Sequence, residues 1–176
     1  PSERAKNVIS DIPKKYGKTP KYRFTKGEAD KELKTVSRDE LIKALEKAHD
    51  TVWQGGRFDP TDAFDEVSKL LFCKLKDEKN TTKGDPYSFQ IGTHELPEEV
   101  YKRINGIYQK AKKEDAEVFK DNIKLEPKVV YNVVEHLQTL AINKIDLDTK
   151  GVAFEVFMTD FFKGKMGQFF TPRPII

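Results

Sequence analysis

The sequence predicts an all-α protein, a helical bundle of about five helices with an irregular basic N-terminal arm and an extended C-terminal segment. Apolar residues recur near a period of 3.6 in five stretches between residues 37 and 164, and none shows the strict apolar–polar alternation of a half-buried strand. Each stretch begins at a residue type that commonly starts a helix. These positions are Ser37, Asp59, Pro97, Pro127 and Asp148.

The first helix is expected to begin after Ser37, because Ser37 and Glu40 have the spacing of a capping box. Its apolar face is then continued at helical spacing, and Gly55-Gly56 ends the helix after Trp53. The face consists of Leu41, Leu45, Ala48 and Val52.

The second helix is expected to begin at Asp59-Pro60, a capping residue followed by proline at the first helical position. Its apolar residues extend almost all round, so this helix should be central to the core. We interpret the acid pair Asp77-Glu78 near its end as charges on a solvated face. The polar residues 80–96, with two glycines and a proline, predict a mobile loop or a small hairpin.

The third helix is expected from Pro97 and the fourth from near Pro127. The four valines at 129, 130, 133 and 134 favour a strand by propensity, but a helical period continues for longer than an ordinary strand, and this length favours a helix. Asp148 is expected to cap the fifth helix. That helix carries a heavy aromatic stripe of Phe154, Phe157, Phe161 and Phe162, together with Met158.

Positive charge is concentrated at the N-terminus. Residues 1–26 contain eight bases and two acids, a balance of +6 in a chain whose net charge is +3. Breaks at proline and glycine predict that residues 1–36 form an arm or linker, which could contact DNA phosphates or could equally be a solvated tail. The residues expected to contact DNA are Lys14, Lys15, Lys18, Lys21 and Arg23.

The composition excludes several classes. No apolar run approaches the roughly 18–20 residues of a membrane span, and no signal-peptide pattern opens the chain. The single cysteine, Cys73, cannot form an intrachain disulfide, so a cytoplasmic location is expected. Cys73 and the three histidines lack the close spacings of metal ligands, so no metal is expected. The sequence has no Gly-rich phosphate loop and no nucleophile elbow.

Three stretches together resemble one family. They are VWQGGRFDPTDAFDEVSKLLFCKLKDEK (Val52–Lys79), DLDTKGVAFEVFMTDFF (Asp146–Phe162) and GQFFTPRPII (Gly167–Ile176). In this order they resemble the N-terminal helical region of the modification subunits of type I restriction–modification systems. The last stretch is the most specific, because it is similar to the Gly-Gln-Tyr/Phe-Phe/Tyr-Thr-Pro-Arg motif that opens the methyltransferase fold of that family.

The resemblance implies an adenine-specific DNA methyltransferase, which transfers a methyl group from S-adenosylmethionine to the exocyclic amino group of adenine. Residues 37–164 would be the helical N-terminal domain, and residues 165–176 the start of the catalytic domain. The resemblance assigns Gln168, Phe170, Thr171 and Pro172 to the cofactor pocket. In this family the remaining cofactor loop and the catalytic Asn/Asp-Pro-Pro-Phe/Tyr loop follow that motif. No catalytic residue and no tight cofactor binding are therefore expected in residues 1–176.

Gly84-Asp85-Pro86-Tyr87 is similar to that catalytic loop with one proline missing. An aspartate before a proline is also an ordinary turn, and the polar surroundings favour the turn.

The partners implied by the resemblance are double-stranded DNA, a specificity subunit and a second modification subunit, with a restriction subunit in the complete assembly and no membrane. Two alternatives remain. The chain could be a non-enzymatic helical module that binds a protein through the Phe-rich fifth helix. It could also belong to a single-chain enzyme that combines nuclease, methyltransferase and target recognition, with residues 1–36 as a linker from the nuclease.

Overall fold

The computed structural model describes residues 21–54, 57–117 and 119–160. Within them the chain forms five α-helices and one short 3-10 helix, η1, and no strand beyond isolated β-bridges. The prediction of an all-α bundle of about five helices is confirmed. The elements are α2 (Arg38–Trp53), α3 (Pro60–Asn80), α4 (Pro97–Glu114), α5 (Pro127–Leu137), η1 (Ile142–Lys144) and α6 (Leu147–Asp160).

The first two helices begin where their capping residues predict. The backbone N–H of Glu40 donates to the Ser37 hydroxyl at 3.2 Å, and the Glu40 carboxylate accepts from the Ser37 N–H at 2.7 Å, which completes the capping box. Asp59 caps α3 by accepting from the N–H of Asp62 at 2.8 Å. These local bonds satisfy amides that would otherwise lack a partner at the helix start.

The expected cap of the last helix was wrong by two residues. The helix α6 begins at Leu147, and Asp146 rather than Asp148 caps it. The Asp146 carboxylate accepts from the backbone N–H of Thr149 at 2.8 Å and from its hydroxyl at 2.6 Å. Asp148 lies inside the first turn, where its negative charge still favours the helix N-terminus.

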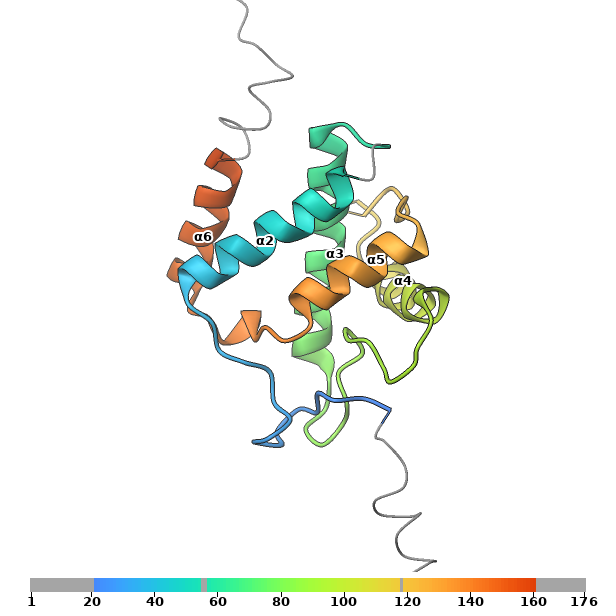
Figure 1. Cartoon of the computed structure of the whole chain (residues 1–176), viewed down its shortest axis with the longest axis vertical. Coiled ribbons are helices and arrows are strands. Elements are labelled where there is room, and N and C mark those ends of the chain that lie inside the picture. The colour runs from blue at the N-terminus through green and yellow to red at the C-terminus, as the bar shows by residue number, and fades with distance from the viewer. Residues whose placement is uncertain (1–20, 55–56, 118, 161–176) are drawn as a thin grey trace, which may run out of the picture.

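The central element is α3, as predicted. In Figure 1 it runs along the long axis, α2 and α5 cross in front of it, α6 lies beside α2, and α4 lies on the opposite side. Side chains from these helices form one continuous core, and α5 contributes Val130, Val133 and Val134, all fully buried. These valines are helical in spite of their strand propensity, because the helical period places them on the face of α5 that packs against α2 and α4.

Residues 21–36 pack against the helices without being helical, and we call them the strap. The strap lies with the loop 81–96 at the foot of α3 (Figure 1). Single β-bridges join Thr25 to Pro86 and Lys34 to Leu140. The strap buries Phe24 and Leu33 against Tyr87 and Ala141 in a second, smaller core cluster. It is therefore part of the folded body.

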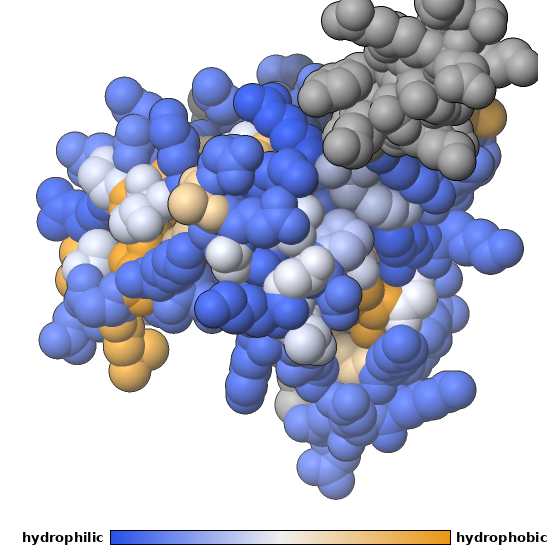
Figure 2. All heavy atoms as spheres, turned by 90° about the horizontal axis from the view of Figure 1, so that it is seen from below, coloured by the Kyte–Doolittle hydropathy of each residue, from blue (hydrophilic) through white to orange (hydrophobic). Residues whose placement is uncertain are grey.

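The loop 81–96 is irregular, and it is neither a hairpin nor detached from the body. Tyr87 is 3% exposed, and Phe89 and Gln90 are completely buried. Figure 2 views the molecule from the end that carries the strap and this loop. Hydrophilic side chains cover most of the described surface in that view, and apolar surface is limited to small separate areas.

Candidate functional site

The described part of the chain contains only two of the residues that sequence reasoning singles out for function, Lys21 and Arg23 at the start of the strap. The other sequence-predicted site residues lie outside the described residues. They are the DNA-contacting candidates Lys14, Lys15 and Lys18 and the cofactor candidates Gln168, Phe170, Thr171 and Pro172.

A buried glutamine holds the start of the strap. The side-chain oxygen of Gln90 accepts from the backbone N–H of Arg23 at 3.1 Å and of Phe24 at 2.9 Å. Its side-chain nitrogen donates to the carbonyl oxygens of Phe24 at 2.8 Å and of Tyr87 at 2.7 Å. One fully buried amide thus uses all four of its hydrogen-bonding positions to join the strap to the loop.

An arginine on α4 secures the same place. Arg103 donates to the carbonyl oxygens of Ser88 at 2.8 Å and of Gln90 at 2.5 Å, and its guanidinium forms a two-pronged ion pair with Glu95. The guanidinium also lies over the ring of Tyr22, with 5.2 Å between its central carbon and the ring centroid.

The carboxylate in this cluster stays ionised. Burial alone would raise the pKa of Glu95, but hydrogen bonds from Arg103 and from the N–H of Gly92 outweigh burial and lower it. Because these contacts surround the first residues of the strap, the backbone positions of Lys21 and Arg23 are fixed relative to the helices. The carbonyl oxygen of Lys21 also accepts from the N–H of Thr93 at 2.8 Å.

The interpretation of Asp77-Glu78 as solvated charges is wrong, because the two side chains are only 7% and 6% exposed. Asp77 accepts from the N–H of Phe89 at 2.8 Å and so holds the loop. Glu78 accepts from the backbone N–H groups of Ile142 at 2.8 Å and Asn143 at 2.9 Å, so it holds η1. Both carboxylates can be buried at the end of α3 because backbone N–H groups of other segments donate to them.

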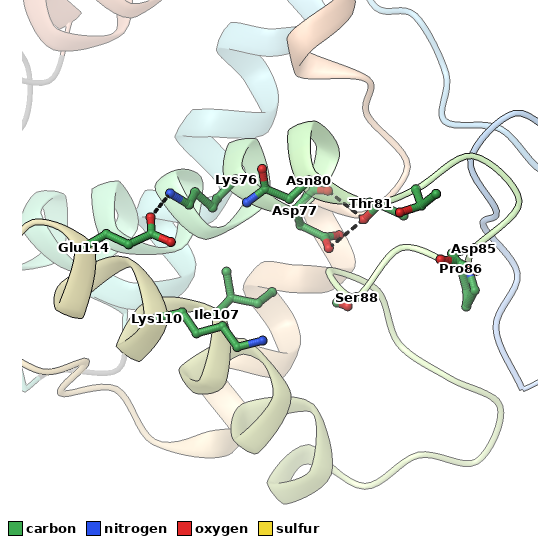
Figure 3. Close-up of a pocket in the computed structure, with 11 residues that line it drawn as sticks. Lys76, Asp77, Asn80, Thr81, Asp85, Pro86, Ser88, Ile107, Lys110 and Glu114 are labelled. Atoms are coloured by element: carbon green, nitrogen blue, oxygen red, sulfur yellow. Dashed lines mark hydrogen bonds and ion pairs between the residues drawn. The ribbon is translucent and has the colours of Figure 1, made fainter.

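A polar pocket of about 300 Å³ lies between the end of α3, the loop and α4. Figure 3 shows Lys110 and Ile107 projecting into it from α4, with Lys76 on α3 ion-paired to Glu114 across its rim. Asp77 forms its wall and accepts from the Thr81 hydroxyl at 3.0 Å. The carboxylates of Glu114 and Asp77 thus already have partners, and the pocket offers a polar recess rather than an acid–base pair.

The turn interpretation of Gly84-Asp85-Pro86-Tyr87 agrees with the geometry. Gly84 has φ +95°, a left-handed conformation that glycine adopts without strain, and the N–H of Asp85 donates to the carbonyl of Thr82 at 2.9 Å. The Tyr87 side chain is buried and its hydroxyl donates to Glu32 at 2.5 Å. A ring engaged in this way is not placed to hold a flipped base.

The described residues show no activated nucleophile. Burial is the main cause that raises the pKa of the Cys73 thiol to about 12, with a smaller contribution from Asp77, so the thiol stays protonated and inaccessible at neutral pH. Burial also lowers the pKa of Lys74, although Glu78 lies 3.3 Å from its ammonium and acts in the opposite direction. Lys74 is 1% exposed and no substrate reaches it.

The same described residues contain neither a metal-ligand cluster nor a membrane-spanning helix. Across residues 21–54, 57–117 and 119–160, no three His, Cys, Asp or Glu side chains are grouped to hold a metal ion. No helix of this described part combines the length and the apolar character that crossing a bilayer requires.

Comparison of the chain with models of known protein families and with curated proteins found no match. We therefore infer its function from its own residues and motifs.

Proposed function

We propose that the chain is the helical N-terminal domain of a type I-like modification subunit, an S-adenosylmethionine-dependent adenine DNA methyltransferase that acts in the cytoplasm. The observation that carries this proposal is the motif GQFFTPR (Gly167–Arg173), which follows the last helix in the order that the family has. With the rest of a catalytic domain, Gln168, Phe170, Thr171 and Pro172 would line the cofactor pocket. The fragment itself would not methylate DNA.

The surface of α6 supports this proposal. The helix packs on α2 and buries Ala153 and Phe157, whose ring stacks on Phe64 at 5.7 Å between centroids. Two other apolar side chains of α6 are exposed, Leu147 at 81% and Val152 at 40%. A single exposed apolar residue is ordinary. Two on the helix that leads to the motif leave apolar surface that a further domain could cover.

The strap supports a role in DNA binding. Lys14, Lys15 and Lys18 precede it in the sequence. Lys21 and Arg23 flank Tyr22, where Gln90 holds the backbone of Arg23 and Arg103 lies over the Tyr22 ring. Lysines and arginines in one stretch would contact phosphates, which fix position without reading sequence. Sequence recognition would then belong to a specificity subunit, and a second modification subunit would complete the enzyme.

The encoding gene and a methylation assay test the proposal. We expect a Gly-rich loop and an Asn/Asp-Pro-Pro-Phe/Tyr motif to be encoded after residue 176, and the complete protein with its specificity subunit to transfer tritiated methyl groups to adenine. Thr171→Val in that protein should weaken cofactor binding, whereas Thr51→Val on α2 should not. A stop codon after residue 176, or no methyl transfer by the complete assembly, would overturn the proposal.

DNA binding by the 176-residue chain is a second, independent test. Each phosphate contact contributes about −0.9 to the slope of log K against log salt concentration, so five contacts predict a slope of about −4.5. Binding should therefore be weak and should be lost between low and moderate salt in a fluorescence-anisotropy titration. Binding that is insensitive to salt, or selective for one duplex sequence, contradicts this reasoning.

A second candidate function is a non-enzymatic module that binds another protein through α6. The exposure of Leu147 and Val152 favours it as much as it favours a domain junction. In the methyltransferase proposal a domain of the same chain covers these side chains, and in the second candidate a different protein does. The reading frame beyond residue 176 distinguishes the two.

A further inference from the structure

A second recess lies where the strap passes the end of α3, beside the segment that leads into η1. It has a volume of about 370 Å³. Three lysines from three separate segments surround it, together with an apolar floor. The lining residues are Lys26, Lys79, Lys144, Leu33, Tyr87, Ala141, Glu78 and Asn143.

The floor of the recess is tightly packed. Leu33, Tyr87 and Ala141 are 6%, 3% and 2% exposed and belong to the smaller core cluster. Backbone bonds hold both sides, because the N–H of Ala141 donates to the carbonyl of Lys34 at 2.8 Å and that of Tyr87 donates to the carbonyl of Phe24 at 3.1 Å. The recess is therefore formed before any ligand arrives.

The lysines around the recess have donors to spare. Lys26 donates to the backbone oxygen of Glu78 at 2.7 Å, and since an ammonium has three N–H donors, two remain. Lys144 is 52% exposed and lies 4.0 Å from a carboxylate oxygen of Glu32. Lys79 is exposed, and no ion pair joins it to another described residue.

The two acids beside the recess, Glu78 and Glu32, are engaged by other groups. Both carboxylate oxygens of Glu78 are used by backbone N–H groups of η1, and the buried Lys74 pairs with it. Glu32 accepts from the Tyr87 hydroxyl and from the N–H groups of Gly27 and Leu33. It offsets Lys144 in part. Among the described residues, no ion pair joins Lys26 or Lys79 to an acid.

We propose that this recess binds the phosphate group of a nucleotide, with the sugar and base against the apolar floor. The three ammonium groups supply charge-assisted hydrogen bonds to phosphate oxygens. Leu33 and Ala141 offer apolar contact to the rest of the nucleotide, as ligand pockets commonly do. The same chemistry serves a free nucleotide and a nucleotide of a nucleic-acid backbone. The proposal does not depend on the methyltransferase assignment, because no residue beyond 144 takes part.

The test compares two matched double variants of the full 176-residue chain by calorimetry at low salt, with 2′-deoxyadenosine monophosphate and a short DNA duplex as probes. Lys79→Ala/Lys144→Ala removes two charges at the recess. Lys113→Ala/Lys128→Ala removes two charges from exposed lysines that do not line it. We expect the first variant to weaken binding by about tenfold, since two close charge interactions are lost. The second should change binding by less than about twofold.

The outcome also identifies the source of the nucleotide. If duplex binding weakens in the recess variant, the ligand is a nucleic-acid backbone; if only the mononucleotide weakens, it is a free nucleotide. If the wild type binds neither probe, or both double variants lose binding equally, the proposal is overturned.

A measurement on the wild type needs no variant. Titration with the mononucleotide should shift the backbone amide signals of Lys26, Tyr87 and Asn143 in NMR spectra, and inorganic phosphate should compete. Shifts confined to other parts of the chain would also overturn the proposal.

Discussion

Replacing Gln90 by leucine tests whether one buried amide holds the strap. The change keeps a side chain of similar size but removes four hydrogen bonds, to the backbone of Arg23, Phe24 and Tyr87. Two of the backbone groups keep another partner. Arg23 is exposed, so its N–H can meet water, and the Phe24 carbonyl still accepts from the Tyr87 N–H at 3.1 Å.

The other two groups, the N–H of Phe24 and the carbonyl of Tyr87, would be left buried without that partner. Each such group costs about 1–3 kcal/mol. A loss of about 3 kcal/mol in the free energy of unfolding is therefore expected, after a small gain from burying the leucine. If the strap instead detaches to hydrate these groups, the same energy corresponds to about a hundredfold increase in its open population.

Two measurements separate these outcomes. Urea unfolding followed by fluorescence of the single tryptophan, Trp53, reports on the helices. Hydrogen exchange at the amides of residues 21–36 reports on the strap. Gln109→Leu is the control. Among the described residues, that side-chain amide donates to Asn105 on α4 and to Asn122 after it, and no buried backbone group depends on it, so the change should cost less than about 0.5 kcal/mol. Stability within about 1 kcal/mol of wild type, with unchanged strap protection, would refute the reasoning.

Three further predictions follow from the described contacts. Ser37→Ala removes the side-chain cap of α2 and should cost about 1 kcal/mol in urea unfolding, and no change would mean that Glu40 alone sustains the helix start. Cys73 should not react with a thiol reagent at pH 8 until the protein unfolds, because it is fully buried and its pKa is raised to about 12, and fast labelling of native protein would contradict this burial. Because the folded pKa of Glu95 is lowered, its contribution to stability is present above its ordinary value of 4.5 and is lost as pH falls through the folded value. Glu95→Gln should therefore make acid unfolding less steep, and parallel acid transitions in the two proteins would reject this account.

The helices could be predicted because their determinants are local. A cap and the first turn lie within four residues of each other, as in the reciprocal bonds of Ser37 and Glu40. The same locality explains the small error at α6. Asp146 and Asp148 are both acids near the start of the helix, and only the paired donors of Thr149 select Asp146.

The strap and the loop 81–96 could not be predicted from periodicity. Their contacts join residues far apart in the sequence, such as Gln90 and Phe24, which are 66 residues apart. In a sequence, a single buried glutamine in a polar stretch such as Gln90 cannot be distinguished from a surface glutamine. The burial of Asp77 and Glu78 has the same origin, because their partners are backbone donors, which the sequence does not distinguish.

The candidate sites were predictable only in part. The basic stretch at the N-terminus predicts Lys21 and Arg23 as candidates. The structure shows in addition that hydrogen bonds fix the backbone of both residues. The recess was not foreseen, because Lys26, Lys79 and Lys144 belong to the strap, the end of α3 and η1. No spacing rule relates such positions, so only the fold brings them together.

The last turns of α3 hold both segments on which the proposed functions depend, the strap and the segment that leads into α6. Adjacent helical residues point about 100° apart, so Asp77 and Glu78 reach different segments. Asp77 holds the loop whose Gln90 fixes the strap, and Glu78 holds η1, which leads directly into α6. The basic start of the strap and the helix before the GQFFTPR motif are thus supported by neighbouring carboxylates of one helix. A DNA contact on the strap would therefore depend on Asp77, and a domain packed against α6 would depend on Glu78. Loss of the hydrogen bonds of either carboxylate would loosen the segment that it holds.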